Sequence, residues 1–136
     1  MATATHFLNV DLDIYSRRDL GALVERLGKK VHVLFAGREG RRYCAHLEIV
    51  GEATTPDSTI RMFCRLIESL PVAERSLWDA ATVRSFSIGI QAGTVPNPCD
   101  FRVHAETLRR AAELGAQIVF TVYPYEQTGF GEVSGA

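Results

Sequence analysis

The segment from His6 to Tyr15 constrains the fold more than any other part of this 136-residue chain. Apolar and polar side chains alternate along it, with Leu8, Val10, Leu12 and Ile14 set against Asn9, Asp11 and Asp13. A period of two is typical of a β-strand that has one side in the core and the other in water. The segment therefore predicts a sheet with one covered apolar side and one open acidic side.

Four further segments show strand-like patterns: Lys30–Ala36, Arg42–Val50, Ser85–Gln91 and Gln117–Tyr123. Both sides of the first of these are apolar, which indicates an interior strand. In the last one, Ile118, Phe120 and Val122 are expected to face inward. The sequence Gly37-Arg38-Glu39-Gly40-Arg41 is typical of a hairpin loop, with solvated arginines, rather than a phosphate-binding loop.

Helical spacing of apolar residues predicts helices between these strands. The first is expected to start with Ser16 as N-cap and to end at Gly28, and the second to start at Thr55-Pro56 and end before Pro71. A shorter piece covers Val72–Ala81. The last helix begins near Val103 or His104 and ends at Gly115, with Leu108, Ala111, Ala112 and Leu114 on its inner side.

The order of these elements predicts an α+β fold with a five-stranded, mostly antiparallel sheet and helices on one face. The first six elements match the β-α-β-β-α-β order of ferredoxin-like domains, which a further helix and strand then extend. A chain of this length fits one domain, which we place at residues 1–124. Residues 125–136 are rich in glycine and without periodicity, so we expect a flexible tail.

Composition narrows the functional classes. The formal net charge is −1, from 15 Lys and Arg against 16 Asp and Glu, so neither nucleic acid nor a membrane surface is an expected partner. Uninterrupted apolar runs stay far below the roughly 20 residues that span a bilayer. Cys44, Cys64 and Cys99 form no CxxC pair, which favours reduced thiols and a cytoplasmic protein over a zinc ribbon or a disulfide framework.

The C-terminal half resembles a known group of proteins. The residues that carry the likeness are Phe86-Ser87-Ile88-Gly89-Ile90-Gln91-Ala92-Gly93, Phe101-x-Val103, Glu106-Thr107-Leu108, Leu114-Gly115-Ala116 and Ile118-x-Phe120-x-Val122-Tyr123. This pattern resembles a bacterial family of small α+β proteins of unknown function, and the helix ends at Leu27-Gly28 and Pro71 fit it as well. The resemblance implies the fold and assigns no catalytic residue.

The polar side of the expected sheet is the candidate site. It combines Asn9, Asp11, Asp13, His46 and Glu48, with Gln91 and Tyr123 as a fringe. The leading hypothesis is a non-enzymatic binding surface, regulatory or immunity-like, for another protein or a second copy, with no cofactor. The alternative is an enzyme or small-molecule binder with a metal on Asp11, Asp13, His46 and Glu48, which zinc or manganese should stabilise.

Each candidate also has a purely structural explanation, which remains open. Alternation alone produces a solvated sheet face, so the polar side need not bind anything. Cys44 and His46 point the same way but about 7 Å apart, too far for a direct thiol–imidazole hydrogen bond, so Cys44 is expected to be idle. Ser85 and Ser87 lack the motif of a hydrolase nucleophile.

Overall fold

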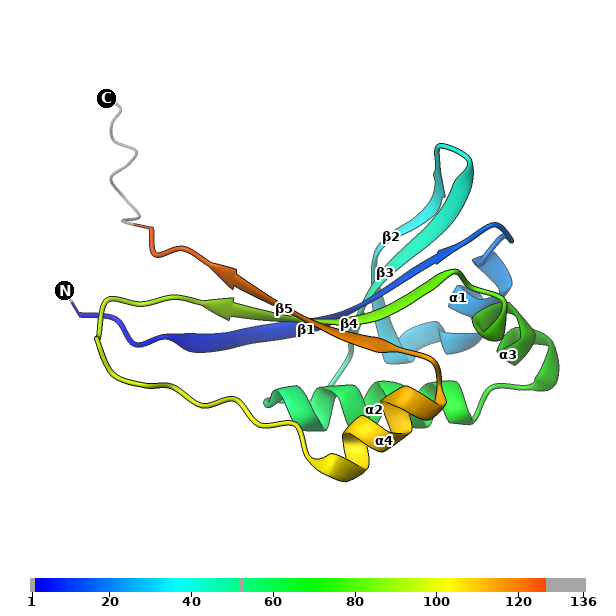
Figure 1. Ribbon diagram of the computed structural model, residues 1–136. Coiled ribbons are helices and arrows are strands. Elements are labelled where there is room, and N and C mark those ends of the chain that lie inside the picture. The colour runs from blue at the N-terminus through cyan, green and yellow to red at the C-terminus, as the bar shows by residue number, and fades with distance from the viewer. Residues whose placement is uncertain (1, 52, 127–136) are drawn as a thin grey trace.

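The computed structural model describes residues 2–51 and 53–126 (Figure 1). In this part of the chain, five strands and four α-helices follow one another, with a single 3₁₀ turn at Gly28–Lys30. Their bounds are β1 His6–Ser16, α1 Gly21–Leu27, β2 Val31–Glu39, β3 Arg42–Ile49, α2 Pro56–Glu68, α3 Val72–Asp79, β4 Val83–Gln91, α4 Ala105–Glu113 and β5 Gln117–Tyr123. Residues 127–136, which belong to the expected flexible tail, lie outside the described part.

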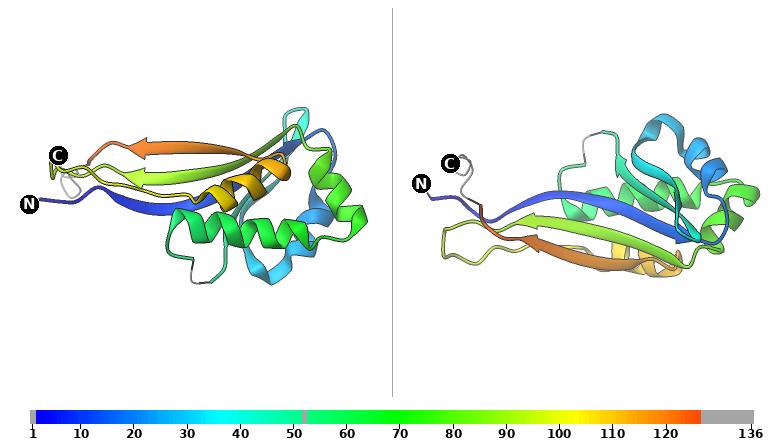
Figure 2. Two further views of the ribbon diagram at one scale, coloured as in Figure 1. Left: turned by 60° about the horizontal axis from the view of Figure 1, so that its bottom comes forward. Right: turned by 90° about the horizontal axis from the view of Figure 1, so that it is seen from above.

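The five strands form one sheet in the order β2-β3-β1-β4-β5, so β1 lies at its centre. The first three pairings are antiparallel and β5 runs parallel to β4 (Figure 2). The expected α+β class is confirmed, with a five-stranded mixed sheet. The ferredoxin-like order is not confirmed, because α3 lies between α2 and β4 and the parallel strand β5 borders the sheet.

The helices lie on one side of the sheet and cover its apolar face (Figure 1). Val10, Leu12 and Ile14 of β1 are buried there, in one core that also includes side chains of all four helices. Each buried side chain of this size contributes about 1.5–3 kcal/mol through the apolar surface it removes from water. Trp78 of α3 is fully buried as well, and its indole N–H donates to the carbonyl of Leu114 at 2.9 Å, just beyond α4.

The prediction that Leu8 faces the core is wrong, since its side chain is 45% exposed. Phe7 pairs with Ile90 and Asn9 pairs with Gly89, so the register shifts at Leu8. Such a bulge inserts one extra residue and turns the side chains before it to the other side. Phe7 therefore packs against the core in place of Leu8.

The predicted interior position of the second strand is also wrong. β2 is an edge strand, and its residues Val33, Leu34 and Phe35 are about half exposed. At the other edge, Phe120 and Val122 of β5 were expected inward, yet they are 57% and 60% exposed. Figure 1 shows the reason for this exposure. The C-terminal end of β5 extends beyond α2 and α4, the helices that cover this side of the sheet.

Two details of the helices differ from expectation and one agrees. Ser16 is the last, buried residue of β1 and accepts a hydrogen bond from the N–H of Arg18, so it does not cap α1, which starts at Gly21. In α4, Thr107 is buried where Leu108 was expected. The start of α2 is confirmed, since Thr55 and Ser58 exchange the two hydrogen bonds of a capping box.

None of the helices in the described residues has both the length and the apolar character that crossing a membrane requires.

Candidate functional site

The side of the sheet that faces away from the helices, here called the open face, collects the polar residues of three adjacent strands. Asp11 of β1 lies opposite Glu48 of β3, and Asp13 lies opposite His46. On the other side of β1, Asp11 lies opposite Ser87 of β4. The structure therefore brings together the five residues of the central candidate set, and Ser87 joins them.

Asp13 is held from two directions. His46 Nδ1 lies 2.7 Å from Asp13 Oδ1, and the Ser87 hydroxyl donates to Asp13 Oδ2 at 2.8 Å. The imidazole ring is flanked by Tyr15, edge-on at 5.7 Å between centroids, and by Phe35 at 6.4 Å. Charge-assisted hydrogen bonds and ring contacts on both sides fix the orientation of His46 and Asp13.

Asp11 and Glu48 share one donor. The side-chain amide of Asn9 donates to Asp11 Oδ1 at 3.0 Å and to Glu48 Oε2 at 2.6 Å. Partial burial, followed by the charges of Glu48 and Asp13, raises the pKa of Asp11 to about 6, against a smaller opposing effect of His46. Burial and the two neighbouring carboxylates therefore both favour the protonated form of Asp11.

Gln91 and Tyr123 lie toward the other end of the open face. The Gln91 amide donates to the carbonyl of Pro124 at 2.9 Å, and Tyr123 is 48% exposed. Between them and the cluster lies Gly89, where an added Cβ would approach Asn9 Oδ1 to 3.0 Å and the Tyr123 ring to 3.7 Å. Gly89 therefore leaves room for Asn9 and Tyr123 to approach each other, a role that the strand pattern did not indicate.

One small cavity of the described residues borders the cluster on the open face. A cavity of about 120 Å³ reaches Asn9 and Glu48 from beside Leu8 and Thr59. Pockets that enclose a small organic molecule are usually about 300–1,000 Å³. The cavity beside Asn9 and Glu48 is therefore smaller than the pockets that usually enclose such a molecule.

The metal hypothesis on Asp11, Asp13, His46 and Glu48 stays a prediction. Within residues 2–51 and 53–126, no three His, Cys, Asp or Glu side chains are grouped as a metal ion would require. The Asn9 amide lies between Asp11 and Glu48, where it hydrogen-bonds both carboxylates. A cation bound between them would first have to displace that amide.

The cysteines of the described residues are all free thiols. Cys44 lies on β3 near His46 but is fully buried, and burial raises its pKa. Burial also raises the pKa of Cys64 to about 11. Since the thiolate is the reactive form, both behave as packed side chains. Cys99 is exposed, and its thiol lies 3.3 Å from the carbonyl of Thr5.

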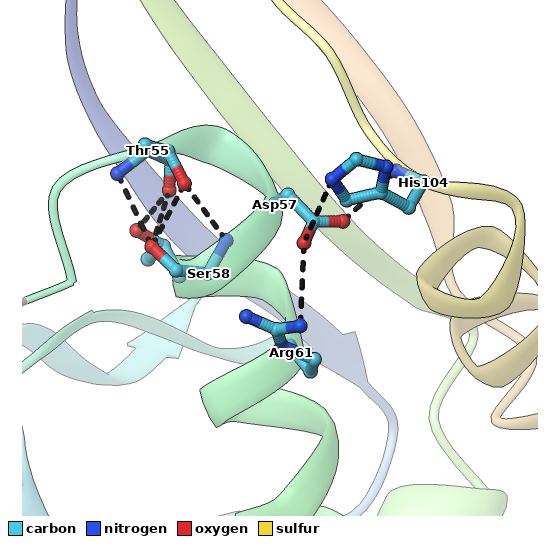
Figure 3. Close-up of polar contacts among 6 residues, drawn as sticks. Thr55, Asp57, Ser58, Arg61 and His104 are labelled. Atoms are coloured by element: carbon cyan, nitrogen blue, oxygen red, sulfur yellow. Dashed lines mark hydrogen bonds and ion pairs between the residues drawn. The ribbon is translucent and has the colours of Figure 1, made fainter.

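A second polar cluster lies on the helix side and was missed in the sequence (Figure 3). Asp57 Oδ1 accepts the N–H of His104 at 2.9 Å, and Arg61 lies 3.6 Å from Oδ2. Burial alone would raise the pKa of Asp57, but hydrogen bonds from the Thr107 hydroxyl and the His104 N–H hold it below its ordinary value. Asp57 thereby joins the first turn of α2 to the first turn of α4.

This cluster borders a groove of about 500 Å³ whose walls include Phe7, Arg61, Phe101 and Arg102. The Asp57 carboxylate already has hydrogen-bond donors and a cation among its neighbours. These contacts explain how α2 and α4 are held together. The only sequence signal for it was the position of an acidic residue in the first turn of a helix, where a carboxylate is favoured.

No family model, curated protein or solved structure matches this chain. The resemblance to a bacterial family of small α+β proteins therefore stays a prediction.

Proposed function

We propose that this chain is a non-enzymatic binding domain that contacts another protein through the open face of its sheet. The observation that supports this most directly is the cluster of Asp11, Asp13 and Glu48, held by Asn9, His46 and Ser87 on the side away from the helices. Side chains fixed in this way lose little conformational freedom when a partner binds. A regulatory or immunity-like role belongs to this class.

The chemistry of the face indicates the kind of partner. Three carboxylates stand against one imidazole, and the pKa of Asp11 is raised first by partial burial and then by the charges of Glu48 and Asp13. A lysine or arginine side chain placed over the cluster would relieve that repulsion and donate charge-assisted hydrogen bonds to the carboxylates. Phe35 and Tyr123, each about half exposed, provide aromatic contact area at the margins, as protein interfaces favour.

The test compares three baits in extracts of cells that naturally produce the protein. The open-face variant Asp13→Asn with Glu48→Gln removes two carboxylates while keeping their shapes. A matched control, Asp79→Asn with Glu113→Gln, removes two exposed carboxylates that form helix-surface ion pairs with Arg75 and Arg109. We expect one protein to be retained by the wild type and the control and lost from the open-face variant.

The retained protein is then purified and its affinity measured by calorimetry at low and high salt. Loss of two complementary charges should weaken binding by about tenfold or more and flatten its salt dependence. A partner that binds the open-face variant as tightly as the wild type would place the interface elsewhere and refute the proposal.

A further inference from the structure

The outer edge of β5 is a second surface with a defined chemistry. β5 is the last strand in the sheet order and pairs with β4 along its whole length, from Gln117 opposite Ser85 to Tyr123 opposite Gln91. Figure 2 shows its other edge running along the border of the sheet, with no other described strand beside it. An edge of this kind presents backbone donors and acceptors that another strand can use.

The hydrogen bonds between β5 and β4 identify which residues of β5 direct their backbone groups to the free edge. The Tyr123 carbonyl accepts the N–H of Ala92, on the β4 side, at 2.9 Å. Because successive residues of a strand point their backbone groups in opposite directions, Ile118, Phe120 and Val122 direct their N–H and C=O groups to the outer edge. The same three residues have their side chains on the helix side.

The two edges of the sheet differ in how they are protected. β2 carries His32, Arg38 and Glu39 and has a register shift between Val33 and Phe35, features that discourage pairing with another chain. From Gln117 to Tyr123, β5 has no charged residue and no proline. Its Phe120 and Val122 side chains are more than half exposed. β5 is therefore the unprotected edge.

We propose that two copies of this chain associate through β5, in an antiparallel pairing about a two-fold axis at Phe120. The axis places Phe120 opposite Phe120 of the second copy and Ile118 opposite Val122. Val119 then lies opposite Thr121, and Gln117 lies opposite Tyr123. Apolar residues meet apolar residues on the helix side, and no like charges oppose each other.

The register also agrees with the direction of the backbone groups. The backbone N–H and C=O groups of Ile118, Phe120 and Val122 point to the outer edge. Each of these residues therefore becomes part of a hydrogen-bonded antiparallel pair, with about six backbone hydrogen bonds in all. The sequence of β5 is thus complementary to itself, which identifies a second copy as the occupant. A partner through the open face, by contrast, would be selected by its positive charge.

The size of the contact sets the expected strength. Seven residues from each copy are fewer than the roughly 20–30 a side that stable interfaces use, so association should be in the micromolar range and depend on concentration. The proposal goes beyond the binding function above, since Phe120 and Val122 lie on the side of the sheet opposite to Asp13 and Glu48.

Sedimentation velocity of the full chain tests the proposal, from about 5 µM to about 500 µM. The average mass should rise from 15.0 kDa toward twice that value. Phe120→Lys places two ammonium groups opposite each other and should weaken dimerisation at least tenfold. Phe35→Lys on the other edge, at a phenylalanine 47% exposed, is the matched control and should dimerise as the wild type does.

Mixing variants separates loss of pairing from loss of folding. Phe120→Lys and Phe120→Glu should each be monomeric alone, and an equimolar mixture should form a heterodimer because opposite charges then face each other. Amide exchange should show protection of Ile118, Phe120 and Val122 that increases with concentration. A wild type that stays at 15.0 kDa, a Phe120→Lys variant that dimerises normally, or a mixture that stays monomeric would each overturn the proposal.

Discussion

The two sides of β1 differ in environment, although their residues alternate along the same strand. Leu12 and Ile14 are fully buried under the helices, while Asp11 and Asp13 lie on the open face within a hydrogen-bonded cluster. The first pair stabilises the fold by leaving water, and the second pair keeps partly hydrated charge in fixed positions. The same strand therefore supports the core on one side and holds a hydrogen-bonded cluster of polar and charged side chains on the other.

Two carboxylates show this difference most clearly. Asp57, on the helix side, has donors from His104 and Thr107, and its pKa is lowered despite its burial. Asp11, on the open face, is partly buried beside Glu48 and Asp13, and burial, followed by these two charges, raises its pKa to about 6. A carboxylate surrounded by donors stabilises the folded state, whereas one that is partly buried beside like charges costs stability when it ionises.

Truncation in the core should have the largest effect. Phe86→Ala removes a fully buried ring that lies 5.7 Å from Phe63, so we expect a loss of about 3–5 kcal/mol in the free energy of unfolding. Val119→Ala on the open face should cost less than about 1 kcal/mol. Urea denaturation measures both, and equal losses would show that the two sides are not energetically distinct.

Removing the carboxylate on the helix side should have the next largest effect. Asp57→Ala leaves the His104 N–H and the Thr107 hydroxyl without their acceptor, at a cost of about 1–3 kcal/mol at neutral pH. Because the folded-state pKa is below the ordinary 3.8, this contribution is present above about pH 4 and is lost as the pH falls further. Denaturation curves at pH 7 and pH 3 check whether the difference from the wild type shrinks.

Neutralising Asp11 should raise the free energy of unfolding, whereas the two changes above should lower it. Asp11 binds its proton more tightly when folded, so the wild type loses stability as the pH rises from about 4 to about 6. Asp11→Asn keeps the acceptor for Asn9 and should be more stable at pH 7 by about 1 kcal/mol, after allowance for solvent screening of a partly exposed site. At pH 4 the two proteins should be equally stable.

The source of that shift can be checked separately by NMR titration of the Asp11 carboxyl. Glu48→Gln removes the neighbouring charge and should move the midpoint from about 6 toward 3.8. An unchanged midpoint would mean that burial alone, and not charge crowding on the open face, sets the titration of Asp11.

Divalent metals should have the smallest effect. An ion between Asp11 and Glu48 must displace the Asn9 amide, so excess zinc or manganese should change the melting temperature by less than about 1 °C. A clear rise that disappears in the double variant Asp11→Ala with His46→Ala would establish the metal site and favour the enzymatic alternative.

Much of this arrangement was readable from periodicity and turn residues. The alternation in β1 indicated which side is polar, and Thr55-Pro56 indicated where α2 begins. The pairing of β1 with β3 then placed Asp11 and Asp13 opposite Glu48 and His46. The alternation and the helix start depend on contacts close along the chain or on the two-residue repeat of a strand, which the order of amino acids states directly. The pairing of β1 with β3 joins residues far apart in the sequence and was expected only from the order of the elements.

Tertiary structure decided what covers each surface. The bulge at Leu8, the edge position of β2 and the exposure of Phe120 depend on which strands pair and how far the helices reach. The opposite pKa shifts of Asp11 and Asp57 likewise depend on neighbours far away in sequence. The sequence by itself determined which side chains share a face, because a strand repeats every two residues; only the folded chain determined whether that face meets helices, solvent or another charge.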